Sequence, residues 1–149
     1  MNNSISFETY LAEHDTLTYT NVGTSMMPLL RQGKDLFTVR RKTEERCQTG
    51  DVVLYRRSPD QYVLHRIIAV RPEDYVILGD NCIAKEYGIR DEDILGIMTG
   101  YARGGKKHST QEYGYRLYSF FVLHTIGPRV FLKKARGRIG RLAKRRRHG

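Results

Sequence analysis

Three short strings in the sequence contain residue types that together can carry out nucleophilic catalysis. Ser25 lies in Gly-Thr-Ser-Met-Met-Pro at 23–28, His65 follows an apolar run, and Asp80 lies in Gly-Asp-Asn at 79–81. A serine hydroxyl is a weak nucleophile at neutral pH, so it needs a nearby base and hydrogen-bond donors for the oxyanion. Histidine, with an ordinary pKa of about 6.5, suits the base, and a carboxylate can orient the imidazole. The sequence therefore contains the parts of a Ser–His–acid arrangement.

Each string also has an ordinary structural interpretation. A serine beside a glycine commonly occupies a turn, and a single histidine in a strand commonly packs or faces solvent. Gly-Asp-Asn is a good turn sequence, because Asp and Asn bond to their own backbone and tolerate left-handed geometry. The combination of the three strings, rather than any one of them, favours catalysis.

A series of motifs from about residue 22 to residue 100 resembles the signal peptidase and repressor-cleavage superfamily of serine proteases. The resemblance implies a small, mostly-β peptidase domain of antiparallel strands, barrel-like or sandwich-like. It also implies endopeptidase activity on peptides or on leader-type and signal-type segments. In chain order the motifs are G-x-S-M-x-P (Gly23, Ser25, Met26, Pro28), Gly33-Lys34-Asp35, Gly50-Asp51-Val52-Val53, His65-Arg66, Gly79-Asp80-Asn81 and Ile94-Leu95-Gly96.

Members of this superfamily differ in their catalytic base, and the sequence resembles the histidine type. Bacterial signal peptidases and self-cleaving repressors use Ser–Lys, whereas the endoplasmic-reticulum and archaeal type uses Ser–His with acidic support. His65 stands at the position of the base, 40 residues after Ser25. Lys34 and Lys85 lie outside the base motif, so we expect Ser25 as the nucleophile and His65 as the general base.

Two acidic residues are candidates for orienting His65. Asp80, in the Gly-Asp-Asn motif, is ranked first. Glu86 stands six residues later, where histidine-type relatives commonly carry a second acid, and is ranked second because it replaces the family's Asp.

The nucleophile turn is expected to include Gly23, Thr24 and Met26. Many signal peptidases have a serine at the first of these positions, and Gly23 supplies no hydroxyl to an oxyanion. The backbone N–H of Ser25 would then carry more of that stabilisation.

Many short β-like runs separated by turn signals predict an antiparallel sheet rather than βαβ units. We therefore expect a mostly-β domain over residues 1–105, with its catalytic core at about 17–100. The expected strands are Leu17–Val22, Leu36–Val39, Asp51–Tyr55, Tyr62–Val70, Tyr75–Leu78 and Ile94–Gly100.

Helices are expected at both ends of this sheet. A short amphipathic helix is predicted over residues 4–14, with Ser4 as its cap. Residues 106–149 are expected to form a helical, strongly basic extension, with helices over 112–126 and 129–147 separated by Gly127-Pro128.

The net charge of +10 is distributed unevenly. Residues 1–100 carry 12 basic and 15 acidic side chains, whereas residues 101–149 carry 14 basic side chains and one acidic. This asymmetry indicates either a solvated tail or a segment that meets an anionic membrane surface. Nucleic acid is a less favoured partner.

No segment is apolar enough to predict a membrane-crossing helix, which needs about 20 mostly apolar residues. The N-terminus lacks the basic and apolar regions of a secretory signal, so we expect a cytoplasmic protein, with peripheral membrane contact as an option. Cys47 and Cys82 have no metal-ligand spacing, so no metal or other cofactor is expected.

Two other function classes stay open. A catalytically weak or inactive relative would act as a peptide-binding module, which the altered Gly23 and Glu86 positions suggest. A repressor-type protein would cleave itself or a partner, and would be expected to carry a DNA-binding module for which 24 residues before Ser25 leave too little chain.

Overall fold

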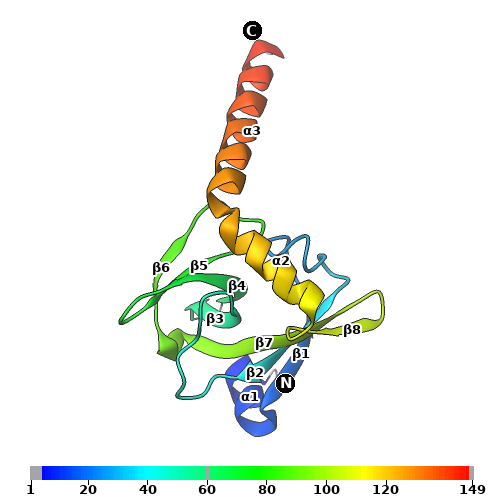
Figure 1. Cartoon of the computed structure of the whole chain (residues 1–149), viewed down its shortest axis with the longest axis vertical. Helices are drawn as coiled ribbons and strands as arrows, with labels where there is room; N and C mark the ends of the chain where they lie inside the picture. The colour runs from blue at the N-terminus through cyan, green and yellow to red at the C-terminus, as the bar shows by residue number, and fades with distance from the viewer. Residues whose placement is uncertain (1–4, 60, 148–149) are drawn as a thin grey trace.

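The computed structural model describes residues 5–59 and 61–147, and β-strands are the main regular structure of its first two thirds (Figure 1). Its strands are β1 (Thr16–Thr20), β2 (Leu36–Arg41), β3 (Val52–Ser58), β4 (Gln61–Val70), β5 (Tyr75–Leu78), β6 (Glu86–Ile89), β7 (Ile94–Arg103) and β8 (Lys106–Ser109). Its helices are α1 (Phe7–His14), the 3₁₀ helix η1 (Asp91–Asp93), α2 (Tyr113–His124) and α3 (Ile126–Arg147).

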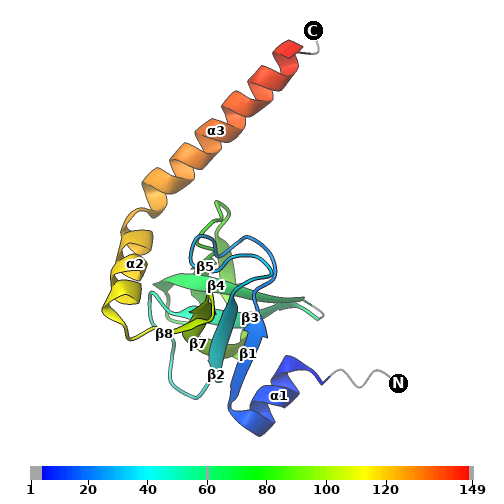
Figure 2. The same ribbon diagram turned by 90° about the vertical axis from the view of Figure 1, so that its right-hand side faces the viewer.

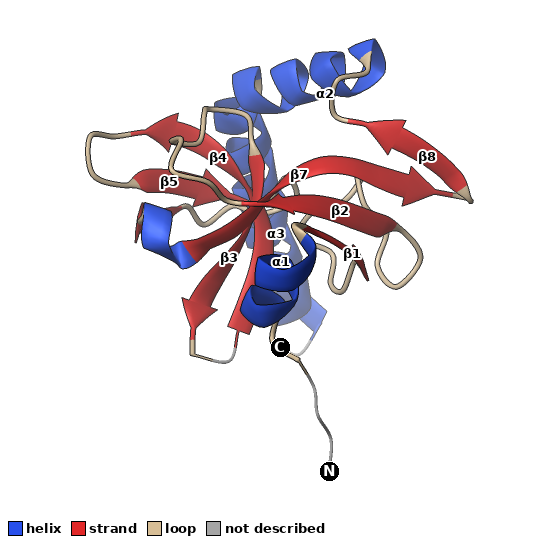
Figure 3. Cartoon of the chain, turned by 90° about the horizontal axis from the view of Figure 1, so that it is seen from below, coloured by secondary structure: helices blue, strands red, loops and turns tan. Residues whose placement is uncertain are grey.

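The eight strands form one antiparallel sheet in the order β1-β2-β7-β3-β4-β5-β6, with β8 paired to β7 beside this path. Figure 3 shows the strands fanning around one another as the sheet twists. The predicted fold class, mostly β with antiparallel strands and a C-terminal helical segment, is confirmed.

Both faces of the central strands are buried. Successive residues of a strand point to opposite faces, and in β3 Val52 and Leu54 belong to one hydrophobic cluster while Val53 and Tyr55 belong to another. This explains why β3 begins as an unbroken apolar run rather than an alternating one. It also means that neighbouring residues of β4 enter different environments.

Two helices complete the first cluster. Leu11 of α1 and Tyr115 of α2 are both buried in it. The cap of α1 is Ser6, whose hydroxyl accepts a hydrogen bond from the Thr9 backbone N–H. The expected cap, Ser4, lies outside the described residues.

Two strands, β6 and β8, were not predicted from the sequence. β6 contains Gly88, which has a φ of +74°, and β8 reads Lys-Lys-His-Ser, so neither shows an alternating apolar pattern. Residues 106–109 were expected to belong to the helical extension, and instead they extend the sheet through pairing with β7.

The basic segment forms two helices that meet at Thr125 (Figures 1 and 2). The break was expected at Gly127-Pro128, but these residues lie in the first turn of α3, where a proline costs no intrahelical hydrogen bond. α2 lies beside the sheet, and α3 projects away from it. Within the described residues, no helix is long and apolar enough to cross a membrane.

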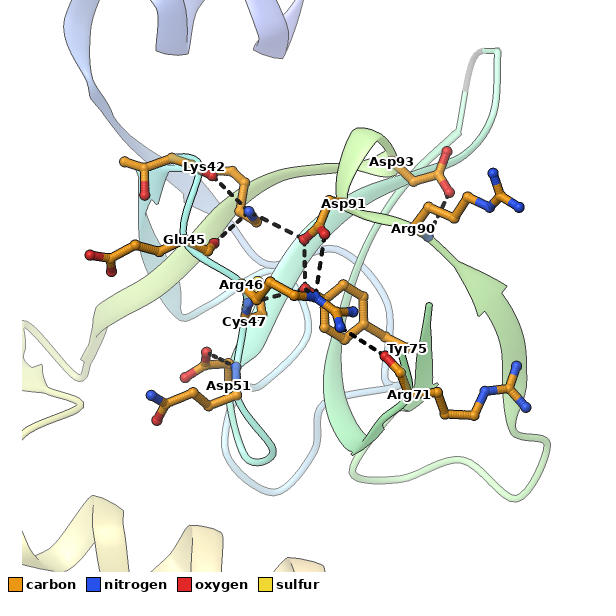
Figure 4. Close-up of polar contacts among 12 residues, drawn as sticks. Lys42, Glu45, Arg46, Cys47, Asp51, Arg71, Tyr75, Arg90, Asp91 and Asp93 are labelled. Carbon is orange, nitrogen blue, oxygen red and sulfur yellow. Dashed lines mark hydrogen bonds and ion pairs between the residues drawn. The ribbon is translucent and has the colours of Figure 1, made fainter. Parts of the chain in front are cut away.

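A polar cluster holds the β2–β3 loop against β5 and η1 (Figure 4). The Tyr75 hydroxyl donates to Asp91 at 2.5 Å and accepts from the Cys47 backbone N–H at 3.1 Å. Lys42 and Arg46 form ion pairs with Asp91 at 3.3 and 3.5 Å. This cluster fixes a long connection without using any of the expected catalytic residues.

Candidate active site

Ser25 lies in a long loop between β1 and β2 whose two ends are joined. The Asn21 backbone N–H donates to the Asp35 carbonyl and the Gly33 N–H to the Asn21 carbonyl, each at 2.8 Å. Asp35 is fully buried, and the Arg31 guanidinium holds the pKa of its carboxyl below the usual range. The two ends of the loop that carries Ser25 are therefore held together by hydrogen bonds.

The nucleophile turn itself is anchored by its neighbours. Met26 is fully buried in the first hydrophobic cluster, which fixes the backbone directly after Ser25. Gly23 has a φ of +90°, a conformation that favours glycine over any residue with a hydroxyl side chain. Within the described parts of the chain, the hydroxyl and the backbone N–H of Ser25 have no hydrogen-bond partner. Ser25 itself is half-buried.

His65 lies on β4, and its imidazole is almost completely buried. Burial lowers the pKa of His65 below its ordinary value, and the nearby Glu86 carboxylate offsets this only in part. The ring is therefore neutral at pH 7, which is the form that a general base requires. The Tyr55 hydroxyl and a Glu86 carboxylate oxygen lie 3.3 and 3.5 Å from Nδ1.

Gly79 is the point where the predicted motifs meet. A Cβ atom placed on it would lie 2.8 Å from the Ser25 carbonyl oxygen and 2.9 Å from His65 Nε2. The same position is 2.7 Å from the Cys82 sulfur. The side of His65 that carries Nε2 thus faces the serine loop, and only glycine leaves room for this approach.

Asp80 does not orient His65. Both of its carboxylate oxygens accept hydrogen bonds from the Arg66 guanidinium, each at 2.8 Å, and Tyr118 donates to one of them at 2.9 Å. The side chains of Arg66 and Asp80 are 0 and 1% exposed. The expectation that Asp80 is the first choice of orienting acid is wrong, because its oxygens are committed to Arg66.

Glu86 lies beside His65, so the order of the two acids is reversed. Its carboxylate also accepts hydrogen bonds from Arg57, with one contact from Nε at 3.1 Å. Burial alone would raise the pKa of Glu86, but the hydrogen bonds from Arg57 and Tyr55 hold it below the ordinary value. Glu86 is therefore ionised at neutral pH and can hold the proton of His65 on Nδ1.

Asn81 joins the turn that follows β5 to the nucleophile loop. Its backbone N–H donates to the Ser25 carbonyl at 2.8 Å, and its side-chain amide donates to the Thr24 carbonyl at 3.0 Å. Lys133 of α3 in turn donates to the backbone and side-chain oxygens of Asn81. These contacts were not predicted from the sequence.

A cavity of about 590 Å³ opens beside His65 and Glu86. Cys82 also contributes to its wall, and burial raises the pKa of that thiol, so it is protonated and a poor nucleophile at neutral pH. The protonated thiol leaves Ser25 as the nucleophile candidate, although Ser25 itself does not line this cavity. The cavity is lined by Arg57, His65, Asn81, Cys82, Ile83, Ala84, Glu86 and Lys133.

Comparison of the chain with protein-family models, with curated proteins and with solved structures found no match.

Proposed function

We propose that the protein is a serine endopeptidase of the histidine-type, signal-peptidase-like class that cleaves a peptide or a leader-type segment. The main support is the meeting of the Ser25 loop and His65 Nε2 around Gly79. The free hydroxyl of Ser25, the neutral imidazole and the adjacent Glu86 add to it. The motif order in the sequence points to the same chemistry.

In the proposed mechanism, His65 Nε2 accepts the proton of the Ser25 hydroxyl as its oxygen attacks a peptide carbonyl. The Ser25 backbone N–H stabilises the oxyanion, and Glu86 stabilises the imidazolium through Nδ1. The imidazolium then protonates the leaving amine, which leaves an acyl-enzyme. Water, deprotonated by His65, attacks the ester and releases the acid product and the free serine.

The substrate in this proposal is an extended peptide. The cavity beside His65 has room for side chains next to the scissile bond, and proteins commonly bind extended peptides against the edge of a sheet. β6, which carries Glu86, ends the described strand path and so offers such an edge.

A cytoplasmic location is part of the same proposal. Cys47 and Cys82 are both free thiols in the described structure. Reduced thiols are typical of the cytosol.

A peptide-binding module is the second candidate. The observation that favours it is the missing hydrogen bond between Ser25 and His65, since neither the hydroxyl nor Nε2 bonds the other within the described residues. Catalytic hydrogen bonds often form only when a substrate binds, so we place this candidate second.

Cleavage of a peptide library by the purified protein tests the proposal. We expect Ser25→Ala and His65→Ala to lose roughly a thousandfold or more of the activity, as loss of a triad member does. Ser58→Ala, at an exposed position of β3 that does not line the cavity, is the matched control and should cleave normally. Equal cleavage by wild type and Ser25→Ala would refute the mechanism, and peptide capture without cleavage would favour the binding module.

A further inference from the structure

The outward faces of α2 and α3 carry bulky apolar side chains that no part of the described chain covers. In α2, Phe120 and Phe121 are 53 and 56% exposed, and Leu117 lies one turn before them. In α3, the exposed apolar residues recur at spacings that place them on one side of the helix: Phe131, Leu132, Ile139 and Leu142. We call these seven residues the apolar stripe.

The stripe is not the side of α2 that packs on the sheet. Other residues of α2 already make the contacts with the sheet. Tyr115 and Ser119 accept hydrogen bonds from Arg66 at 3.3 and 2.8 Å, and Tyr118 donates to Asp80. α2 is thus fixed to the sheet by one face, and the stripe points away from it. Tyr115 is buried, whereas Leu117 is 43% exposed.

The lysine and arginine side chains around the stripe are not balanced by any acidic side chain. Residues 113–147 include eleven lysine and arginine side chains and no aspartate or glutamate. Such a segment attracts an anionic surface and is repelled by a copy of itself. An exposed apolar stripe flanked by basic residues is the pattern of helices that lie in the interfacial plane of a membrane.

We propose that α2 and α3 together bind an anionic lipid surface. The apolar stripe would enter the boundary between headgroups and acyl chains, and the basic residues beside it, such as Arg138 and Arg141, would lie against the headgroups. A nucleic acid would use the basic residues but would offer the stripe no apolar partner. A second copy would cover the stripe only by bringing two strongly cationic helices together.

Binding in this orientation leaves the catalytic contacts of α3 intact. Lys133 and Arg129 lie on a different side of α3 from the stripe, and they donate to the Asn81 and Asp80 carbonyls. The cavity beside His65, which Lys133 also lines, would therefore lie on a side of α3 that the lipid does not cover. The lipid contact does not depend on the proposed peptidase activity, so the two can fail separately.

Co-sedimentation of the full chain with vesicles tests this proposal. We expect binding to phosphatidylcholine vesicles that contain 30 mol% phosphatidylglycerol, and at least roughly tenfold weaker binding to phosphatidylcholine alone. Phe131→Ser combined with Ile139→Ser should weaken anionic binding roughly tenfold or more. Arg138→Gln combined with Arg141→Gln should weaken it by about tenfold or more, since each basic residue contributes about fivefold.

Ile5→Ser is the matched control, because Ile5 is 58% exposed but lies before α1. Circular dichroism of each variant checks that the helices remain folded. Failure to bind anionic vesicles at low salt would overturn the proposal. So would unchanged binding in Phe131→Ser/Ile139→Ser, which would indicate a purely electrostatic partner such as nucleic acid. A concentration-dependent dimer that only this variant loses would assign the stripe to a second copy instead.

Discussion

His65 and Arg66 are neighbours on β4, yet they point to opposite faces of the strand and meet different surroundings. Arg66 is in a buried ion pair, and His65 is at the edge of a cavity. On one face, Arg66 and Asp80 form an ion pair that is almost completely excluded from solvent beneath α2. On the other face, His65 and Glu86 line an open cavity. A buried pair whose hydrogen bonds are all made holds elements together, whereas an acid at the edge of a cavity is free to respond to a proton. Asp80 therefore contributes to the packing beneath α2, and in the proposed mechanism Glu86 supports the base.

The largest effect should come from Asp80→Asn. Arg66 would then be a buried cation without its partner, and breaking such a pair costs about 3–5 kcal/mol of folding stability. Urea unfolding measures the loss. Glu92→Gln, at an exposed ion pair with Arg90, should leave stability unchanged. If the Asp80→Asn protein had normal stability but an altered pH profile of cleavage, Asp80 would act in catalysis rather than in folding.

Tyr118→Phe tests the Arg66–Asp80 face of β4 with a smaller change. It removes one hydrogen bond to the Asp80 carboxylate and keeps the aromatic ring, so we expect a loss of about 1.5–3 kcal/mol in stability. The acid limb of the pH–rate profile should not move. Tyr113→Phe, on the exposed side of α2, provides the control. Stability equal to wild type would mean that α2 contributes little to holding the buried pair.

The alternation of side chains along a strand is enough to predict from the sequence that His65 and Arg66 lie on different faces. His65 and Arg66 must point to opposite sides of β4, so an acid that pairs with Arg66 is poorly placed to orient His65. The same argument applies to Gly79 and Asp80, which follow β5 and approach His65 and Arg66 respectively. The motif order predicted Ser25 and His65, but it contains no information on which basic residue Asp80 meets.

Other parts of the site depend on contacts between distant segments and could not be predicted from local patterns. β6 places Glu86 beside His65, yet its short sequence around Gly88 has no strand pattern. The strands from β1 to β5 and β7 were predicted because each is a short run of β-branched, aromatic or other apolar residues between turn signals. The basic helices were predicted as an appendage, but the contact of Lys133 with Asn81 depends on the angle at which α3 leaves α2.

Glu86→Gln tests the face of β4 that carries His65. The neutral amide no longer stabilises the imidazolium, so we expect kcat/KM to fall roughly tenfold to a hundredfold. Because the Glu86 charge raises the pKa of His65, its removal should move the acid limb of the profile to lower pH. In wild type this limb should already lie below pH 6.5, since burial lowers the pKa of His65. An acid limb that stays in place would show that Glu86 does not interact with the base.

The stability of this variant has its own pH dependence. The pKa of Glu86 in the folded protein lies below its unfolded value of about 4.3, so its contribution is fully present above that value. The contribution is lost as the pH falls through the folded pKa. Wild type should therefore be more stable than Glu86→Gln at pH 7, and the difference should disappear under more acidic conditions. A constant difference would mean that packing rather than charge causes it.

The smallest effect should come from Lys133→Met, which tests whether α3 supports the catalytic face. Lys133 bonds both oxygens of Asn81, and Asn81 bonds the carbonyl of Ser25. Removing the ammonium group should loosen the nucleophile loop and lower kcat roughly twofold to tenfold, as loss of a partly exposed hydrogen bond does. Lys134→Met is the matched control, because it removes the same charge from an exposed position of α3. If both variants lower kcat equally, the effect comes from net charge, and α3 then has no specific role at the active site.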